Sequence, residues 1–329
     1  MNTIAIEKYS FLSLGFLKAY IITMRPYLMF VSGITGIVGM SFSSELGLLK
    51  SSLIFLGCFL SYGFGQALTD CFQIDTDSIS SPYRPLTQGI VSRNQFLFVS
   101  GIGLICCISI LVYYNPLNYL LGGLAAFGLT TYTFFKRKWW AGPFYNSWIV
   151  VVLFTMAYLA GTETNHFVFN NPILIIAILT VFFGYANFVL TGYFKDIEAD
   201  RSTGYNTLPV IFGKKISTIV SDIFGIIAAL SVFALIIFLA LNLFPHNTII
   251  KCLVFIYGGI CATIFTQISL HSIQRDSEAH KAIAPCVHCY ILLLSGLTIL
   301  NKPEWFILLL VFFTLYVLVL KIRPAKEQI

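Results

Sequence analysis

Charged side chains are scarce in this chain: Asp, Glu, Lys and Arg together make up 10% of its 329 residues. A soluble protein has roughly 25% charged residues, so the composition excludes an ordinary soluble domain. The formal net charge of +6 is modest, and we interpret the basic residues as determinants of membrane topology rather than as a nucleic-acid-binding surface. We therefore expect no nucleic-acid partner.

Long apolar runs are what the sequence does contain, since 57% of its residues are hydrophobic. Runs of about 16 to 24 residues recur, close to the length that crosses a bilayer as a helix. They predict an all-α membrane protein with nine to ten transmembrane helices in a single domain over 1–329, in which residues 1–21 form an interfacial segment. The runs lie near residues 22–43, 50–69, 95–113, 117–135, 145–161, 172–194, 217–241, 249–270, 285–300 and 304–320.

The loops between the runs alternate in charge, and one set carries most of the Lys and Arg. The positive-inside rule places that basic set in the cytoplasm. Two Asp-rich loops, 70–94 and 195–216, belong to this set, as do the amino terminus and the carboxyl tail with Lys321 and Arg323. Two cytoplasmic ends require an even number of spans, which favours ten helices over nine. We expect a multi-pass protein of the bacterial inner membrane that contacts membrane lipid.

Acidic residues are concentrated in two stretches that each follow a long apolar run. The chain has 14 acidic residues, and carboxylates gathered at the ends of hydrophobic helices indicate bound cations rather than a solvated surface. Each stretch continues into a Pro and a Gly, a repeat-like feature that favours duplicated halves. The stretches cover residues 61–93 and 193–215 and hold Asp70, Asp75, Asp77, Asp196, Glu198 and Asp200.

The spacing of these acids predicts a magnesium site. Asp196 and Asp200 share a helix face if the helix continues, with Cβ atoms about 5–6 Å apart. A divalent cation removes their repulsion, and Mg²⁺ typically takes one or two carboxylates together with substrate phosphates and water. Asp70 and Asp77 also share a face, and Gln73 lies near it. On a continuous helix Asp75 points roughly to the opposite side.

Basic and aromatic residues supply the rest of a diphosphate site. Five Lys and Arg near the acidic stretches lie on the same side of the membrane, where they can donate hydrogen bonds to phosphate oxygens. Some of the 31 Phe and 17 Tyr can line a tunnel for an isoprenoid tail and stabilise a carbocation through their ring faces. The predicted diphosphate-binding residues are Arg84, Lys136, Arg137, Lys195 and Arg201.

The two stretches together resemble the paired signatures of the UbiA superfamily of intramembrane prenyltransferases. The first signature, Asn-Asp-x-x-Asp-x-x-x-Asp with a following Asn/Tyr-Arg-Pro-Leu/Ile-x-x-Gly, stands here as Thr-Asp-Cys-Phe-Gln-Ile-Asp-Thr-Asp at 69–77 and Tyr-Arg-Pro-Leu-Thr-Gln-Gly at 83–89. The second, Lys-Asp-x-x-x-Asp with Leu-Pro-Val-x-x-Gly, is complete at 195–200 and 208–213. Lys136-Arg137 resembles the basic pair after the family's fourth helix. The spacing is most similar to that of the chlorophyll synthase and archaeal geranylgeranylglyceryl phosphate synthase-like branches.

The resemblance implies about nine transmembrane helices around a central cavity, with caps made from the two acidic loops. It also implies that two Mg²⁺ ions hold a prenyl diphosphate between catalytic, metal-binding carboxylates. Thr69 stands where the family has Asn, and Gln73 stands where it has a central Asp, which removes one carboxylate. Gln73 and Asp75 are further candidate ligands. The predicted metal set is Asp70, Asp77, Asp196 and Asp200.

Three functions remain open at this point. The first is Mg²⁺-dependent transfer of a prenyl group from a prenyl diphosphate donor to a hydrophobic acceptor, with release of diphosphate. The second is a membrane terpene cyclase, in which the chain's own double bonds capture the cation; cyclases of this superfamily also lack a carboxylate in the middle of the first motif. The third is a non-catalytic lipid-binding or transport protein. The sequence does not give the prenyl chain length, the acceptor or the oligomeric state.

Overall fold

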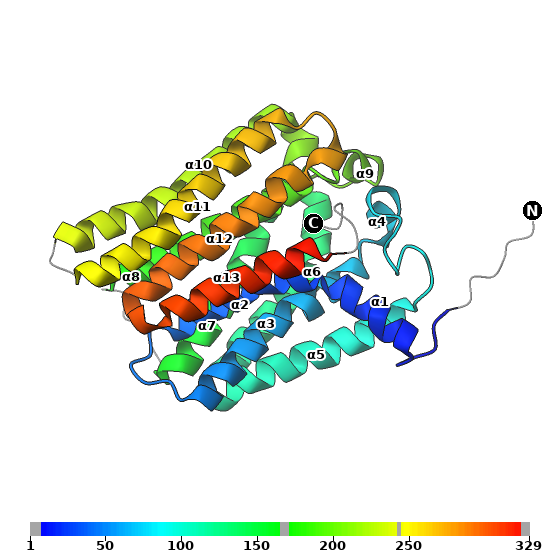
Figure 1. Ribbon diagram of the computed structural model, residues 1–329. Coiled ribbons are helices and arrows are strands. Elements are labelled where there is room, and N and C mark those ends of the chain that lie inside the picture. Colours follow the sequence, from blue (N-terminus) through cyan, green and yellow to red (C-terminus); the bar gives the residue numbers. More distant parts are fainter. Residues whose placement is uncertain (1–7, 165–170, 242–244, 324–329) are drawn as a thin grey trace, which may run out of the picture.

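The computed structural model describes residues 8–164, 171–241 and 245–323, and over these residues it contains helices and no strands (Figure 1). Its long helices form one bundle, and the short helices over Ile74–Ser80 and Ile197–Ser202 lie together at one end of it. The elements are α1 (Leu14–Met24), α2 (Pro26–Met40), α3 (Leu48–Asp70), α4 (Ile74–Ser80), α5 (Arg93–Tyr114), α6 (Asn118–Lys138), α7 (Gly142–Thr162), α8 (Pro172–Tyr193), α9 (Ile197–Ser202), α10 (Leu208–Leu241), α11 (His246–Ser272), η1 (Asp276–Glu278), α12 (His280–Asn301), η2 (Pro303–Trp305) and α13 (Phe306–Lys321).

Eight described helices are each long and apolar enough to cross a membrane. The pair α1 and α2, bent by 55° at Arg25, makes a ninth if it forms one span. The all-helical membrane fold is therefore confirmed. Helix α6, which corresponds to the run near 117–135, falls outside these nine because polar residues and three basic residues in its last turn lower its hydropathy. The choice of ten spans, which depended on sidedness, stays a prediction.

The beginning of the chain differs in detail from the interfacial segment expected over 1–21. Residues 1–7 lie outside the described residues, and α1 runs from Leu14 past residue 21 to Met24. Arg25 then adopts a left-handed conformation, with φ at 52°, before Pro26 starts α2. The bend turns α1 away from the axis of α2 by 55°.

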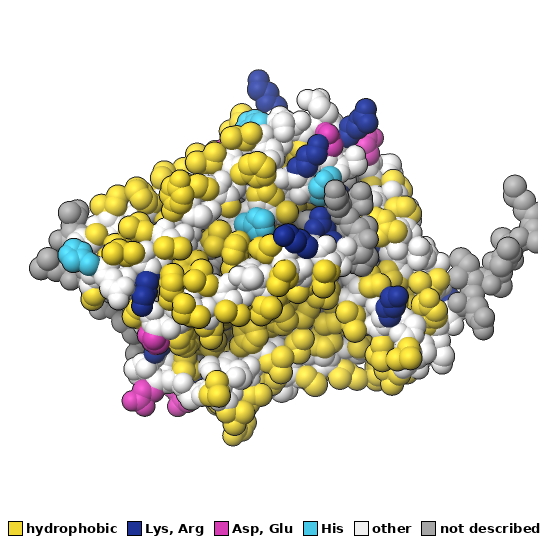
Figure 2. Space-filling model, viewed as in Figure 1, with side chains coloured by type: hydrophobic (Ala, Val, Ile, Leu, Met, Phe, Trp, Pro, Cys, Tyr) yellow, Lys and Arg dark blue, Asp and Glu magenta, His cyan; other side chains and the backbone are white. Residues whose placement is uncertain are grey.

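Apolar side chains cover the outside of the bundle as well as its interior. Figure 2 shows a largely hydrophobic flank, with Lys, Arg, Asp and Glu mainly toward the ends of the helices. Helix α12 is the central helix, with 89% of its apolar window buried, whereas only 22% of the window of α13 is buried. Between α2 and α7 the backbones approach closely, because a Cβ on Gly39 would lie 2.7 Å from the carbonyl oxygen of Phe154. Small residues at such contacts are typical of membrane helix packing.

The two acidic stretches fold alike and lie side by side, since α4 contacts α9 at one end of the bundle (Figure 1). In each, a long helix ends, three residues turn, and a short helix begins. Gln73 starts α4 with φ and ψ of −120° and 20°, and Asp196 starts α9 with −115° and 14°. The amide of Asp77 donates to the carbonyl of Gln73 (2.9 Å), as the amide of Asp200 does to that of Asp196 (2.7 Å). Gln73 and Asp77 therefore match Asp196 and Asp200.

The same break corrects one assumption made from the sequence. Helix α3 ends at Asp70, so Asp70, Asp75 and Asp77 do not lie on one continuous helix. The second stretch also breaks, between Tyr193 and Ile197. The spacing of Asp196 and Asp200 nevertheless stays helical, because Asp196 caps the helix that contains Asp200.

Candidate active site

One deep cavity runs into the bundle beneath α4 and α9. Its polar part is lined by both acidic stretches together with residues of α6 and of the bend between α1 and α2. Its apolar part is lined by α2, α3, α5, α7 and α8, among them Tyr62, Tyr185 and Phe188. The shape combines a charged mouth with an apolar, partly aromatic interior. The charged and amide side chains of the lining are Arg25, Gln66, Asp70, Gln73, Asp77, Arg84, Lys136, Asn146, Lys195 and Asp196.

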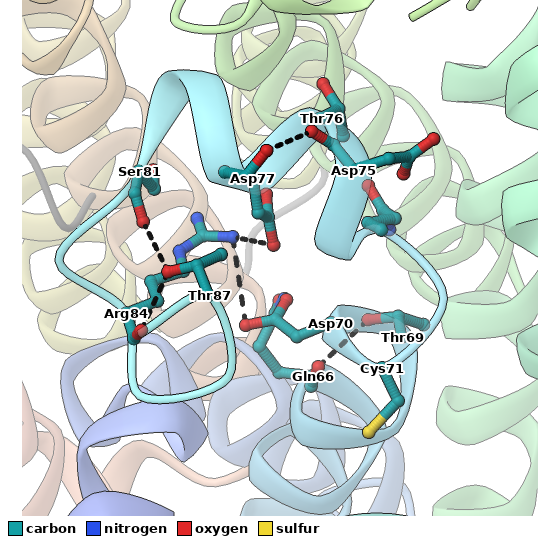
Figure 3. A network of polar contacts seen from close by, with 12 residues as sticks. Gln66, Thr69, Asp70, Cys71, Asp75, Thr76, Asp77, Ser81, Arg84 and Thr87 are labelled. Atoms are coloured by element: carbon teal, nitrogen blue, oxygen red, sulfur yellow. Dashed lines mark hydrogen bonds and ion pairs between the residues drawn. The ribbon is translucent and has the colours of Figure 1, made fainter. Parts of the chain in front are cut away.

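Two arginines, Arg25 and Arg84, hold Asp70 and Asp77 of the first stretch, and Figure 3 shows Arg84 directed at both carboxylates. Arg84 forms an ion pair with Asp77, and its Nη1 lies 3.8 Å from Oδ2 of Asp70. From the opposite side, Nη2 of Arg25 lies 2.9 Å from the same Asp70 oxygen. The Nε2 of Gln66 donates to Oδ1 of Asp70 (2.6 Å). The loop that carries Arg84 is fixed by Thr87, whose hydroxyl donates to the Arg84 carbonyl (2.7 Å).

A lysine holds the second stretch to the first. The Nζ of Lys136 lies 3.4 Å from Oδ1 of Asp200 and donates to Oε1 of Gln73 (3.2 Å). Lys136 is only 3% exposed, and its ammonium lies 5.2 Å and 4.9 Å from the ring centroids of Tyr193 and Tyr205. Cation–π contact stabilises a buried ammonium at such distances. Lys136 is therefore fixed between the two acidic stretches.

Burial and neighbouring cations set the charge states of the loop residues in opposite directions. Burial raises the pKa of the Asp77 carboxyl to about 6, even though Arg84 lowers it. Burial also raises the pKa of Asp196, but Lys136, Lys195 and Arg84 together outweigh burial and hold that pKa below its usual value. Burial and the positive charge of Arg84 lower the pKa of the Lys195 ammonium to about 7. Asp196 thus stays ionised where the cations converge.

Three of the predicted site residues are not brought to this cavity. Asp75 is partly exposed and pairs with Arg137, whose Nη2 lies 2.5 Å from its Oδ2. Arg137 also stacks on Tyr205, with 4.3 Å from its Cζ to the ring centroid. Arg201 is exposed and lies 3.7 Å from Glu198 on the surface of α9. The break before α4 turns Asp75 outward, and Figure 3 shows it pointing away from the Asp70–Arg84 contact.

Asp200 lies one layer behind the cavity wall. Its side chain is fully buried and accepts hydrogen bonds from the hydroxyls of Thr76 (3.3 Å) and Thr207 (3.2 Å). It reaches the cavity through Lys136. The other predicted residues, namely Asp70, Gln73, Asp77, Arg84, Lys136, Lys195 and Asp196, line the cavity directly.

Arg25 and Gln66 are functional candidates that the sequence reasoning missed. A signal for Arg25 was present, because it is a charge inside the apolar run predicted over 22–43, and an ionisable residue there indicates a functional site. Gln66 stands four residues before Asp70 on the same helix, where an i,i+4 contact is expected. Both side chains hydrogen-bond to Asp70.

The donor set fits Mg²⁺ bound together with a phosphate ligand. No group of three or more His, Cys, Asp or Glu within the described part of the chain is close enough to form an all-protein metal cage. Mg²⁺ seldom needs one, because it is usually bound by one or two carboxylates with substrate phosphates and water. Asp196 supplies a buried Oδ1 that has no hydrogen-bond partner among the described residues, and Asp70 and Asp77 line the same cavity.

The sequence pattern of the UbiA prenyltransferase family matches residues 29–288 of this chain. The chain belongs to this family. The match includes both acidic stretches and most of the bundle. The predicted resemblance and the prediction of a membrane-embedded prenyltransferase are confirmed at the level of the UbiA family.

Individual relatives agree with the family. The digeranylgeranylglyceryl phosphate synthase of Pyrococcus horikoshii is 30% identical over 224 residues, which cover 66% of this UbiA-family chain and 76% of the relative. That of Pyrococcus abyssi is 27% identical over 218 residues, with the same coverage.

Solved structures show the same fold. A UbiA homologue from Aeropyrum pernix superimposes with a TM-score of 0.67 at 18% identity, covering 82% of this chain and 96% of the homologue. A UbiA homologue from Archaeoglobus fulgidus, solved with GPP and Mg²⁺, gives a TM-score of 0.63 at 16% identity, covering 92% of this chain and all of that one.

Proposed function

We propose that this chain transfers a prenyl group from a Mg²⁺-bound prenyl diphosphate to the hydroxyl of an isoprenoid glyceryl phosphate. The observation that carries the proposal is one cavity with two opposed acidic motifs and four cations at its mouth and an apolar, tyrosine-containing interior. The acceptor class is proposed from the relatives, which are synthases of digeranylgeranylglyceryl phosphate. Such a product implies an acceptor that already carries one prenyl ether and a phosphate.

The charge balance of the cavity supports a metal-bound diphosphate. Four cations line it, against three carboxylates, a formal surplus of one positive charge. A diphosphate brings more negative charge than this surplus neutralises, so further cations are needed when it binds. We propose that Asp70, Asp77 and Asp196 hold Mg²⁺, and that Asp200 holds Lys136 in position. When bound, Mg²⁺ supplies positive charge to the phosphate oxygens and stabilises the departing diphosphate.

The chain's own residues then perform the transfer as follows. Arg25, Arg84 and Lys136 bind the diphosphate oxygens and stabilise the charge that develops when the C1–O bond breaks and its electron pair leaves with the diphosphate. Tyrosine ring faces, such as that of Tyr62, stabilise the allylic cation. The acceptor oxygen bonds to C1, and its proton passes to the released diphosphate, which is the base that the reaction itself supplies. The apolar interior holds the prenyl tail and excludes water.

The replacement of a carboxylate by Gln73 favours one second candidate, the terpene cyclase. Both reactions begin with the same ionisation and differ in what captures the cation. Incubation of the purified full chain with Mg²⁺ and prenyl diphosphates, with and without geranylgeranylglyceryl phosphate, separates them. We expect an ether product that needs the acceptor. A cyclic hydrocarbon or alcohol formed without acceptor would instead establish the cyclase.

The protein is a multi-pass integral membrane protein, and we propose that α4 and α9 face the cytoplasm of a bacterial inner membrane. Lys and Arg accompany these caps, as the positive-inside rule requires. Single Cys probes at the exposed positions Ser78 and Ser202, in a background without native Cys, test the orientation. An impermeant thiol reagent should label them only in opened vesicles; labelling in intact cells would reverse the topology.

A further inference from the structure

A second cavity, the outer pocket, adjoins the active-site cavity at the same end of the bundle. It has a volume of about 490 Å³ and is formed by α4, the loop after it, α9, the start of α10 and residues 274–280. Among the described residues, Lys195 alone lines both cavities. Its Nζ donates to the hydroxyl of Tyr83 (3.2 Å), which also lines the outer pocket. The two cavities are thus separated by about one side chain at this point.

The outer pocket has the character of a site for a small anion. Three cations line it, namely Lys195, Lys214 and Arg275, together with the hydroxyls of Tyr83 and two serines. Lys and Arg with hydroxyl donors are the groups that proteins use for phosphate. Arg275 is exposed and has no ion pair within the described ranges. It can therefore meet a ligand without first giving up a carboxylate.

Two carboxylates also line the outer pocket, and both already interact within the protein. Asp276 lies 3.3 Å from Nζ of Lys214 and accepts a hydrogen bond from the amide of Glu198 (2.9 Å). The Glu198 side chain is 79% exposed and lies 3.7 Å from Arg201. Counting Lys195, which also lines the active-site cavity, the three cations of the outer pocket exceed its two carboxylates by one formal charge. An anion that enters meets donors on more than one side.

We propose that the outer pocket binds the phosphate group of the acceptor and so selects phosphorylated acceptors. This inference rests on the proposed prenyl transfer to a glyceryl phosphate. In such a molecule only a few bonds separate the phosphate from the reacting hydroxyl, which matches two cavities that meet at Lys195. The acceptor phosphate lies on the outer side of Lys195, and its hydroxyl lies on the inner side beside the donor.

Charge-neutral substitutions in the outer pocket test the proposal. Arg275→Gln and Lys214→Gln should each raise KM for geranylgeranylglyceryl phosphate about tenfold, the effect of losing one charge-assisted hydrogen bond at an exposed site. KM for the prenyl diphosphate should not change, and neither should KM for geranylgeranylglycerol, the same acceptor without its phosphate. Lys215→Gln is the matched control, since Lys215 neighbours Lys214 but does not line the outer pocket.

Each other outcome contradicts the proposal or separates it from the proposed function. An equal rise in KM for both acceptors, or no change for either, overturns it. Weaker product inhibition by pyrophosphate with an unchanged acceptor KM assigns the pocket to the leaving diphosphate, which also overturns it. If the wild type forms no ether at all, the proposed prenyl transfer is wrong. Titration of the full chain with glycerol phosphate then tests whether the outer pocket binds phosphate. Binding weakened by Arg275→Gln then supports a phosphate site, and equal binding refutes it.

Discussion

The two acidic stretches share one backbone and differ in their side chains. At matching positions the first carries Gln73 and Asp77, and the second carries Asp196 and Asp200. Arginines hold the carboxylates of the first stretch, whereas Lys136 and Lys195 accompany the second. The difference indicates that the two stretches contribute different groups to the site. The carboxylates of the first stretch are paired with arginines, whereas the second stretch keeps one buried carboxylate oxygen, Oδ1 of Asp196, without a partner among the described residues.

Lys136 shows what the missing carboxylate changes. Its ammonium lies 3.2 Å from the neutral Gln73 and 3.4 Å from Asp200. With Asp at position 73, Lys136 would lie between two carboxylates. The neutral amide leaves the charge of Lys136 directed to one carboxylate and to the cavity. This asymmetry can be tested residue by residue.

The largest effect is expected at Asp196, whose buried Oδ1 has no partner among the described residues. Asp196→Asn keeps the shape but removes the charge that would hold Mg²⁺. We expect kcat to fall by about 10²–10³-fold, the range found when one transition-state-stabilising group is lost. The protein should still insert and purify normally. Glu198→Gln, which changes an exposed neighbour on α9, is the control. A near-normal rate for Asp196→Asn would contradict the assignment of Asp196 as a Mg²⁺ ligand.

An intermediate effect is expected at Arg84, which pairs with Asp77 in a largely buried setting. Arg84→Gln leaves a buried carboxylate without its main partner, a change that typically costs about 3–5 kcal/mol. Thermal unfolding in detergent should show a lower midpoint. The double variant with Asp77→Asn should recover much of that loss, because the unpaired charge is gone. An additive double variant would show that the pair does not stabilise the cap.

The sequence predicted the site residues that follow from local patterns, and it did not predict those whose position depends on contacts between distant segments. The membrane fold, the family and seven cavity residues followed from apolar runs and motif spacing, because these features are local. Asp75, named only as a further candidate ligand, lies outside the cavity lining and pairs with Arg137, in line with the opposite side to which helical spacing assigned it. Arg137 and Arg201 do not line the cavity, because each forms an ion pair with a carboxylate at the surface, Asp75 and Glu198 respectively. The outer pocket joins segments about 200 residues apart in sequence, from α4 to Arg275, and no local pattern places them together.

The smallest change in rate, and the sharpest comparison of the two stretches, is expected from Gln73→Asp. It gives the first stretch the carboxylate that the second has at Asp196. In a prenyltransferase it should preserve or raise activity and tighten the dependence on Mg²⁺; in a cyclase it should lower activity or alter the product. Rates across a Mg²⁺ titration, with product analysis, distinguish these results. A variant identical to wild type in rate, in dependence on Mg²⁺ and in product would place Gln73 outside the metal site.

The central claim is that both stretches hold one prenyl diphosphate through Mg²⁺. Calorimetric titration of the full chain with a non-ionising thiolodiphosphate analogue, with Mg²⁺ and with EDTA, tests it most directly. We predict that Mg²⁺ tightens binding by at least about tenfold, equivalent to about 1.4 kcal/mol, and that Asp196→Asn abolishes this gain. Equal affinity with and without Mg²⁺, or a full gain retained by Asp196→Asn, would contradict the claim.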